Sequence, residues 1–173
     1  MKIPVALGLA LYQEFITQSE EAELLMQLRM YMPDKPRHGV RDRNAIVRFG
    51  STKPFNDVRD GKIPTHLDWL CIKLAQERHT PTKPDSITIN EYYPGQVIRP
   101  HVDPAQAGPV ITVLSLASDA TMVFTKKDEE PIVVELPARS LVQMRDEIRY
   151  EWEHEIKPVK ELRYSMVFRC STE

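Results

Sequence analysis

The sequence predicts an α+β fold in which helices pack on a jelly-roll core, the double-stranded β-helix. Two segments of the first half have helical periodicity, and short β-rich runs follow one another in the second half. Many short strands separated by turn-forming residues are typical of sandwiches, jelly rolls and barrels. A length of 173 residues suits one domain. We therefore expect a single domain over 1–173, with a helical and lid part at 1–83 and the β core at 84–173.

The N-terminal segment predicts one strand and one helix. The run 4–12 is apolar and indicates a strand. Thr17 and Glu20 have the spacing of a capping box, in which each residue's side chain binds the other's backbone N–H at the start of a helix. We expect that helix to span about 18–31.

The next segment, 33–64, is polar and loop-rich, with one expected strand at 45–49. A second helix is expected to begin at Thr65, with Asp68 in the capping-box position. Its apolar residues recur at helical spacing and form a one-sided stripe. They are Leu67, Leu70, Cys71, Leu74 and Ala75.

After Lys83, β-branched and aromatic residues cluster in short runs, and turn-forming residues separate most of them. We expect the strands of the β core in these runs. They span 87–93, 110–116, 121–125, 131–136, 140–144, 149–154 and 163–170.

Composition limits the classes of function. With a net charge of −2, bulk charge does not attract nucleic acid, so any such contact must come from a local patch. Cys71 and Cys170 lie far apart and outside any CxxC pair, and the sequence shows neither a signal-peptide-like start nor a long apolar run. We expect a cytoplasmic or nuclear monomer with reduced thiols and no membrane contact.

The stretch 86–103 carries the first chemical motif. An alternating run ends at a Pro-Gly turn, and His101 and Asp103 follow. Residues i and i+2 of an extended backbone point to the same side, so this imidazole and carboxylate can converge. One distant histidine, for which His154 is the candidate, would complete the two-His, one-carboxylate set of non-haem Fe(II) oxygenases. Taken singly, each histidine is equally consistent with an ordinary loop or surface residue.

The C-terminal run 163–169 separates an apolar strand face from a face that carries Arg163, Ser165 and Arg169. If the charged face points inward, its guanidinium groups need a partner, because an unpaired buried charge is costly. A bound dicarboxylate could be that partner. If the strand lies at the edge of a sheet, the same face contacts solvent, and the pattern alone slightly favours this second alternative.

Several motifs follow one another between residues 86 and 170. They are Asn90-x-Tyr92, Tyr93-Pro-Gly-Gln, His101-x-Asp103, Val113-Leu-Ser-Leu-Ala-Ser, Pro137-Ala-Arg-Ser-Leu, Arg149-Tyr-x-Trp-x-His154-x-Ile and Arg163-Tyr-Ser-x-x-Phe-Arg169. In this order and spacing they resemble the AlkB-like Fe(II)/2-oxoglutarate-dependent dioxygenases. The sequence pattern is most similar to that of the oxygenase domain of the eukaryotic member that modifies tRNA. Residues 8–28 also resemble the usual N-terminal segment of the family.

The resemblance implies an enzyme with Fe(II), held by His101, Asp103 and His154, with 2-oxoglutarate as cosubstrate and O2 as oxidant. These three residues would be catalytic as well as metal-binding. Ala105 departs from the family's bacterial DNA-repair enzyme, which has a second acid two residues past the ligand Asp that helps to read the damaged base. The base preference of that enzyme therefore does not carry over.

The resemblance also implies a cosubstrate site. Arg163 would bind the distal carboxylate of 2-oxoglutarate, and Arg169 would lie towards the metal end. Ser165 and Val167 stand where the family's R-x-N-x-T-x-R pattern has Asn and Thr. Ser165 is a tolerable polar replacement, so we expect cosubstrate binding to survive. The full set implied for 2-oxoglutarate is Asn90, Tyr92, Arg163, Ser165 and Arg169.

A local excess of basic residues occurs at 35–62, a segment that contains nine Lys, Arg and His residues but only three Asp residues. In a chain of negative net charge this excess predicts a phosphate-facing patch, and family members use the equivalent region as a lid over a flipped or single-stranded base. Arg41, Arg43 and Arg48 are the predicted nucleic-acid contacts, and Phe49 or Phe55 could stack on a base or belong to the core. The alternative is an ordinary solvated loop.

Three functions remain open at this point. The favoured one is oxidative demethylation or hydroxylation of alkylated bases in single-stranded DNA or RNA, with release of succinate, CO2 and formaldehyde. The second is the same chemistry on a protein side chain or small molecule. The third is an inactive binding module, which the presence of every implied metal and cosubstrate position disfavours.

Overall fold

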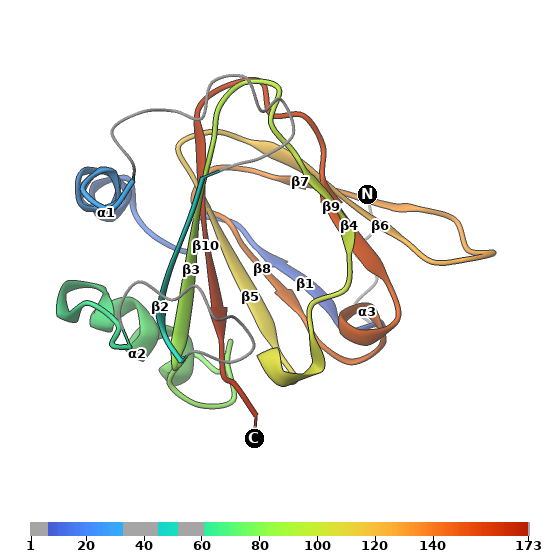
Figure 1. Cartoon of the computed structure of the whole chain (residues 1–173), viewed down its shortest axis with the longest axis horizontal. Helices are drawn as coiled ribbons and strands as arrows, with labels where there is room; N and C mark the ends of the chain where they lie inside the picture. The colour runs from blue at the N-terminus through green and yellow to red at the C-terminus, as the bar shows by residue number, and fades with distance from the viewer. Residues whose placement is uncertain (1–6, 33–44, 52–60, 173) are drawn as a thin grey trace.

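The structure is a computed structural model that describes residues 7–32, 45–51 and 61–172. Two antiparallel sheets face each other, and helices α1 and α2 cover the outer side of the larger sheet (Figure 1). The larger sheet has the order β1-β8-β5-β10-β3-β2, and the smaller has the order β4-β9-β6-β7. This sandwich, with its helix preceding the β core, confirms the predicted α+β fold with a double-stranded β-helix core.

The strands are short, as the spacing of turn residues predicts. They are β1 (Leu9–Tyr12), β2 (Ala45–Gly50), β3 (Ser86–Tyr92), β4 (Ile98–His101), β5 (Ile111–Leu116), β6 (Ala120–Thr125), β7 (Ile132–Leu136), β8 (Leu141–Met144), β9 (Glu153–Ile156) and β10 (Arg163–Arg169). The helices are α1 (Gln18–Arg29), α2 (Asp68–Gln76) and α3 (Asp146–Tyr150), with single 3₁₀ turns η2 (Thr65–Leu67) and η3 (Ala105–Ala107).

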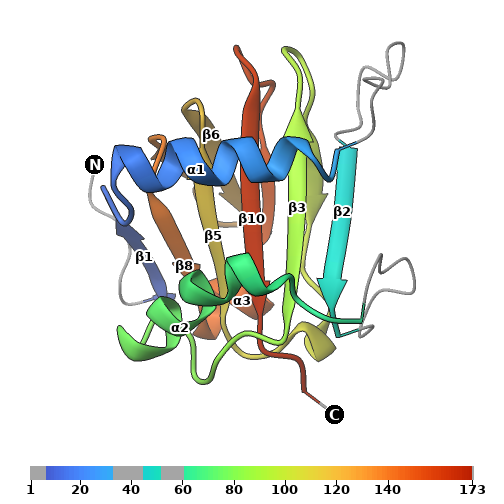
Figure 2. The same ribbon diagram turned by 90° about the vertical axis from the view of Figure 1, so that its left-hand side faces the viewer.

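Two hydrophobic cores lie on the two faces of the larger sheet. Figure 2 shows α1 running across the strands of this sheet, and α1 and α2 bury Leu24, Leu28 and Leu70 in the outer core. The inner core lies between the sheets and contains Phe124 and Trp152. Both faces of the larger sheet are therefore covered, and its central strands are buried throughout.

Strand β10 resolves the two alternatives for the run 163–169. It pairs with β3 on one side and with β5 on the other, so it is central and not an edge strand. Tyr164, Met166 and Phe168 lie in the outer core, whereas Arg163 and Arg169 are on the inner face and buried, 0% and 5% exposed. The interpretation of the charged face as a solvent face is thus wrong, because alternation predicts the faces of a strand but not its neighbours.

The two predicted helix starts differ in outcome. The capping box of α1 is confirmed: the backbone N–H of Glu20 donates to Oγ1 of Thr17 at 3.2 Å, and the backbone N–H of Thr17 donates to Oε2 of Glu20 at 2.7 Å. The predicted cap at Thr65 is wrong. Pro64 leads into η2, Thr65 is the first residue of that turn, and neither η2 nor α2 has a side-chain cap.

The run 149–154 is not one strand. It divides into the end of α3 and the start of β9. Ile148 and Arg149, which are adjacent, are both buried, and a strand with one buried face would alternate them between core and solvent. Strand β4 is a further strand, which the pattern of the Pro-Gly turn segment does not reveal.

No helix in the described ranges has the length and apolar character needed to span a membrane.

We predict that Thr17→Ala lowers the free energy of unfolding by about 1 kcal/mol, because the N–H groups of the first turn lose their side-chain acceptor. Urea denaturation measures this change. Thr65→Ala is the matched control, since exposed Thr65 caps nothing, and it should change stability by less than about 0.5 kcal/mol. Equal losses in the two variants would contradict the assignment of the caps.

Candidate active site

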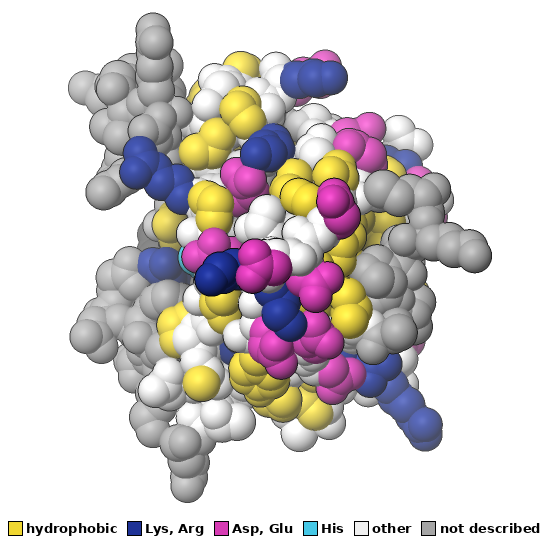
Figure 3. Space-filling model, turned by 90° about the vertical axis from the view of Figure 1, so that its right-hand side faces the viewer, with side chains coloured by type: hydrophobic (Ala, Val, Ile, Leu, Met, Phe, Trp, Pro, Cys, Tyr) yellow, Lys and Arg dark blue, Asp and Glu magenta, His cyan; other side chains and the backbone are white. Residues whose placement is uncertain are grey.

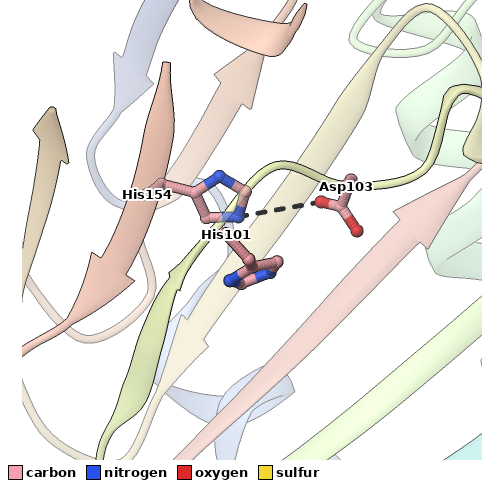
Figure 4. Close-up of side chains that lie close together, drawn as sticks. All are labelled: His101, Asp103 and His154. Atoms are coloured by element: carbon pink, nitrogen blue, oxygen red, sulfur yellow. Dashed lines mark ion pairs between the residues drawn. The ribbon is translucent and has the colours of Figure 1, made fainter. Parts of the chain in front are cut away.

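Strand pairing brings His101, Asp103 and His154 together. His101 ends β4 and lies opposite His154 of β9 in the register of the smaller sheet, and the two ring centroids are 4.4 Å apart. Asp103 follows two residues after His101 and turns its carboxylate towards the same point (Figure 4). The candidate ligand atoms of the three residues all lie within 4.8 Å of one another. The geometry suits a single metal ion with open coordination positions.

Hydrogen bonds outside this cluster orient its donor atoms. Nδ1 of His101 donates to the main-chain carbonyl of Arg99 at 2.9 Å, which places the lone pair of the neutral ring on Nε2. Oδ1 of Asp103 accepts from Nη2 of Arg169 at 2.9 Å. Its other oxygen, Oδ2, lies 3.7 Å from Nε2 of His154, too far for a hydrogen bond (Figure 4). One lone-pair-bearing atom of each residue is therefore directed to a common space.

The protonation states also suit metal binding. Burial, followed by the neighbouring His101, lowers the pKa of His154 to about 4, so its imidazole is neutral at physiological pH and does not form a true ion pair with Asp103. Burial is the largest single effect on Asp103 and opposes its ionisation, but the charge and hydrogen bond of Arg169, together with His154 and His101, outweigh burial and lower the pKa of this carboxyl. Neutral imidazole and ionised carboxylate are the forms that bind a divalent metal.

Arg163 is a buried cation that lacks a full set of partners. Its Nη2 donates to Oγ of Ser115 at 3.0 Å, and its guanidinium carbon lies 4.8 Å from the centre of the Tyr92 ring. Its Nε and Nη1 have no hydrogen-bond partner among the described residues, and burial lowers the pKa of this guanidinium. A buried guanidinium with unused N–H donors fits a bound carboxylate, because charge-assisted hydrogen bonds to a carboxylate are strong.

Polar side chains connect Arg163 with the metal cluster. Nδ2 of Asn90 donates to Oγ of Ser165 at 3.2 Å, and the Tyr92 hydroxyl lies 3.4 Å from the same oxygen. Nη1 of Arg169 donates to Oγ1 of Thr88 at 2.8 Å. These side chains all lie on the inner faces of β3 and β10, which pair in register. Ser165 thus contacts both Asn90 and Tyr92 on this polar wall.

The cluster and the buried arginine border one cavity of about 320 Å³ between the sheets. Its walls contain all eight residues predicted for metal and cosubstrate. Arg48 of β2 also lines it, whereas Arg41, Arg43 and Phe55 lie outside the described residues. Phe49 is 3% exposed and packs against Tyr31 in the outer core, so the idea that it stacks on a base is wrong. The apolar wall consists of Val97, Ile98, Val113, Met122, Ile156 and Val167.

Sequence reasoning did not single out Thr88, Ser115 or Arg149. Thr88 could have been found by alternation, because it shares a strand face with Asn90 and Tyr92. Ser115 lies opposite Ser165 across the β5–β10 ladder, and that register cannot be read from the sequence. Arg149 lies in a recognised motif, but its contacts depend on helix α3.

Comparison with known proteins assigns nearly the whole chain to one family. A family model described as the 2OG-Fe(II) oxygenase superfamily matches residues 8–169. The uncharacterized protein L905 of Acanthamoeba polyphaga mimivirus is 31% identical over 160 residues, which cover 88% of this chain and 74% of that protein. The tRNA (carboxymethyluridine(34)-5-O)-methyltransferase ALKBH8 of Mus musculus is 34% identical over 163 residues, or 88% of this chain.

The match to the mouse protein covers only 24% of that protein's length, so the chain spans about a quarter of it. Among solved structures, OsALKBH1 superposes with a TM-score of 0.72 and 14% identity, over 98% of this chain and 99% of that one. At that identity the likeness concerns the fold.

We predict that Arg163→Met leaves the ligand-free protein as stable as the wild type or raises its free energy of unfolding by about 1–4 kcal/mol, because it removes a buried cation with unused donors. Arg139→Met is the matched control. Arg139 is paired with Glu14 at 2.7 Å and with Glu21, whose side chain is 10% exposed, at 3.2 Å. The control should destabilise the protein in urea denaturation, since Glu21 loses its counter-ion and keeps only the hydrogen bond from the backbone N–H of Ala117. A large loss of stability in Arg163→Met would show that the guanidinium has partners of its own in the free protein.

Proposed function

Because the chain belongs to the 2OG-Fe(II) oxygenase superfamily and is AlkB-like within it, we propose that it hydroxylates a C–H bond of a modified nucleic-acid base. His101, Asp103 and His154 are the proposed Fe(II) ligands. The observation that carries the proposal is the meeting of these three donors beside the buried, incompletely paired Arg163. Bound Fe(II) and 2-oxoglutarate supply the oxidation of the C–H bond by O2, with release of succinate and CO2, and a hydroxylated N-methyl group then leaves as formaldehyde.

The protein's own residues bind and orient. Arg163 is proposed to hold the far carboxylate of 2-oxoglutarate with its unused N–H groups, and Asn90, Tyr92 and Ser165 to form the polar wall beside it. Arg169 holds one oxygen of Asp103, which keeps that carboxylate ionised and fixed in direction. The apolar residues of the cavity limit the water that reaches the reacting atoms.

Two observations support a nucleic-acid substrate. The mouse and Xenopus tropicalis relatives, 34% and 32% identical, are named for their action on tRNA, and Arg48 of β2 borders the cavity where a phosphate flanking the base would come close. Arg41 and Arg43 are proposed as further contacts. The alternative is that the protein performs the same oxidation on a protein side chain or a small molecule. The substrate panel described below distinguishes the two.

The opposite side of the molecule is a poorer surface for a polyanion. On the face beyond the smaller sheet, acidic and basic side chains are interleaved (Figure 3). Lys126 pairs with Glu147 at 2.9 Å and with Glu151 at 2.7 Å, and Lys157 pairs with Glu155 at 2.7 Å. Because these cations are already neutralised by neighbouring carboxylates, we place the nucleic-acid contacts at the cavity side.

His101→Ala is predicted to abolish turnover of 2-oxoglutarate and to weaken Fe(II) binding, because one nitrogen ligand is lost. Arg163→Ala should chiefly raise the KM for 2-oxoglutarate. His66→Ala is the matched control: His66 bonds the Tyr31 hydroxyl at 3.0 Å and does not line the cavity. Succinate formation and anaerobic Fe(II) titration measure these effects. Wild-type activity in His101→Ala would refute the ligand assignment.

The substrate class is tested with a panel of methylated single- and double-stranded DNA and RNA oligonucleotides, tRNA anticodon stem-loops with modified uridines, and peptides. We expect succinate release to rise with at least one single-stranded nucleic acid, with a mass change of one oxygen or the loss of one methyl group. Arg48→Ala should raise the KM for that substrate and leave the KM for 2-oxoglutarate unchanged. Stimulation by a peptide alone would instead establish the protein-substrate alternative.

A further inference from the structure

Arg149 makes an unusual set of contacts next to the metal cluster. It is 3% exposed, and each nitrogen of its guanidinium group donates to a different main-chain carbonyl. Nη1 donates to Asp103 at 2.9 Å, Nη2 to Pro104 at 2.7 Å and Nε to Gly108 at 3.1 Å. A buried cation usually has a carboxylate partner, because desolvation of the charge is costly. Arg149 instead gives all three of these hydrogen bonds to the backbone of one loop, and its guanidinium carbon lies 4.8 Å from the centre of the Tyr150 ring.

We propose that Arg149 is a positioning residue that fixes the main chain of the loop 103–108 and thereby sets the place of the Asp103 carboxylate in the metal site. The inference rests on the proposed role of Asp103 as a metal ligand. Arg149 itself touches neither the carboxylate nor the proposed metal position. It acts through the loop backbone.

Arg149 also connects the two chain segments that carry the ligands. It lies in α3, directly before β9 and His154. This segment is anchored by Trp152, which is buried in the inner core and donates to Oε1 of Glu147 at 3.2 Å. One side chain thus joins the segment of the third ligand to the loop of the second. A shift of either segment would change the distance between Asp103 and His154, which is 3.7 Å at the nearest atoms.

The far end of the same loop is held against the end of β10. Gly108 has φ +96°, and a Cβ there would lie 2.0 Å from the carbonyl oxygen of Cys170. The backbone N–H of Thr172 donates to the carbonyl of Gln106 at 3.1 Å. The loop therefore follows one defined path, and the side chain of Asp103 is held separately by Arg169. Main chain and carboxylate thus have independent anchors, both of them buried arginines.

The three contacts require arginine. A planar guanidinium presents donors in several fixed directions, whereas a lysine ammonium has one nitrogen on a flexible stem. Lysine at 149 could satisfy at most part of the set and would leave carbonyls of the loop without donors. We expect Arg149→Lys and Arg149→Met to weaken metal binding about 10–100-fold, the usual effect of losing an outer contact that orients a ligand.

The test is anaerobic titration of the full chain with Fe(II), and with Mn(II) as a redox-stable probe, by calorimetry. Wild type, Arg149→Lys, Arg149→Met and Arg139→Met are compared, with the urea stability of each metal-free protein measured in parallel. Arg139→Met is the control because it breaks a half-buried guanidinium contact with Glu21 of α1 that is unrelated to the cavity. A purely structural role predicts that the Arg149 and Arg139 variants lose stability and keep their metal affinity.

The proposal expects weaker metal binding only in the Arg149 variants, and an unchanged KM for 2-oxoglutarate at saturating Fe(II), because Arg163 lies on β10. If Arg149→Met does not fold, Arg149→Lys alone decides. Metal affinity within threefold of wild type in a folded Arg149 variant overturns the positioning role and leaves the proposed function intact. A wild-type protein that binds neither metal overturns the proposed function, and this inference with it.

Discussion

The burial of two arginines on the inner face of β10 is the constraint on which the rest of this structure depends. β10 is hydrogen-bonded on both sides, and on its inner face, between the sheets, Arg163 and Arg169 are only 0% and 5% exposed. Each therefore requires compensation inside the cavity. Arg169 finds it in Asp103, whereas Arg163 has a hydroxyl, an aromatic face and two unused N–H groups. The asymmetry distinguishes the end of the cavity beside Asp103, the proposed metal site, from the end beside Arg163, the proposed carboxylate site.

The smaller sheet contributes a different constraint, which is register. His101 and His154 lie opposite each other only because β4 and β9 pair as they do, and a slip of one residue would turn one imidazole to the other face. Asp103 lies beyond the strand, where the sheet no longer fixes it. Its position depends on two guanidinium groups, one at its carboxylate and one at its carbonyl. The histidines are thus placed by the fold, and the carboxylate is placed by side chains.

The sequence predicts much of this arrangement. The features that it does not predict are those that depend on contacts between distant parts of the chain. Periodicity finds most strands of the β core and the two faces of the run 163–169, because alternation is a local property of the backbone. It does not reveal that β10 is central, since strand order depends on pairings with residues some 50–80 positions away. The wrong prediction of a strand at 149–154 has a similar cause. Arg149 is buried by contacts with a loop that is distant in the sequence, and a local sequence pattern carries no information about such contacts.

In the proposed function, the chemistry of the site and the choice of substrate are carried by different parts of the chain. The proposed metal and cosubstrate residues lie on β3, β4, β9 and β10 or directly beside them, in a frame whose strand pairings leave little freedom. Arg48, by contrast, lies on β2, which among the described strands is at the edge of its sheet and pairs with β3 alone. An edge strand can change its side chains, and its flanking loops can change in length, without disturbing the arginines of β10. The same oxidation can therefore serve different substrates, and the residues that distinguish them must be sought at the β2 side of the cavity and not around the metal.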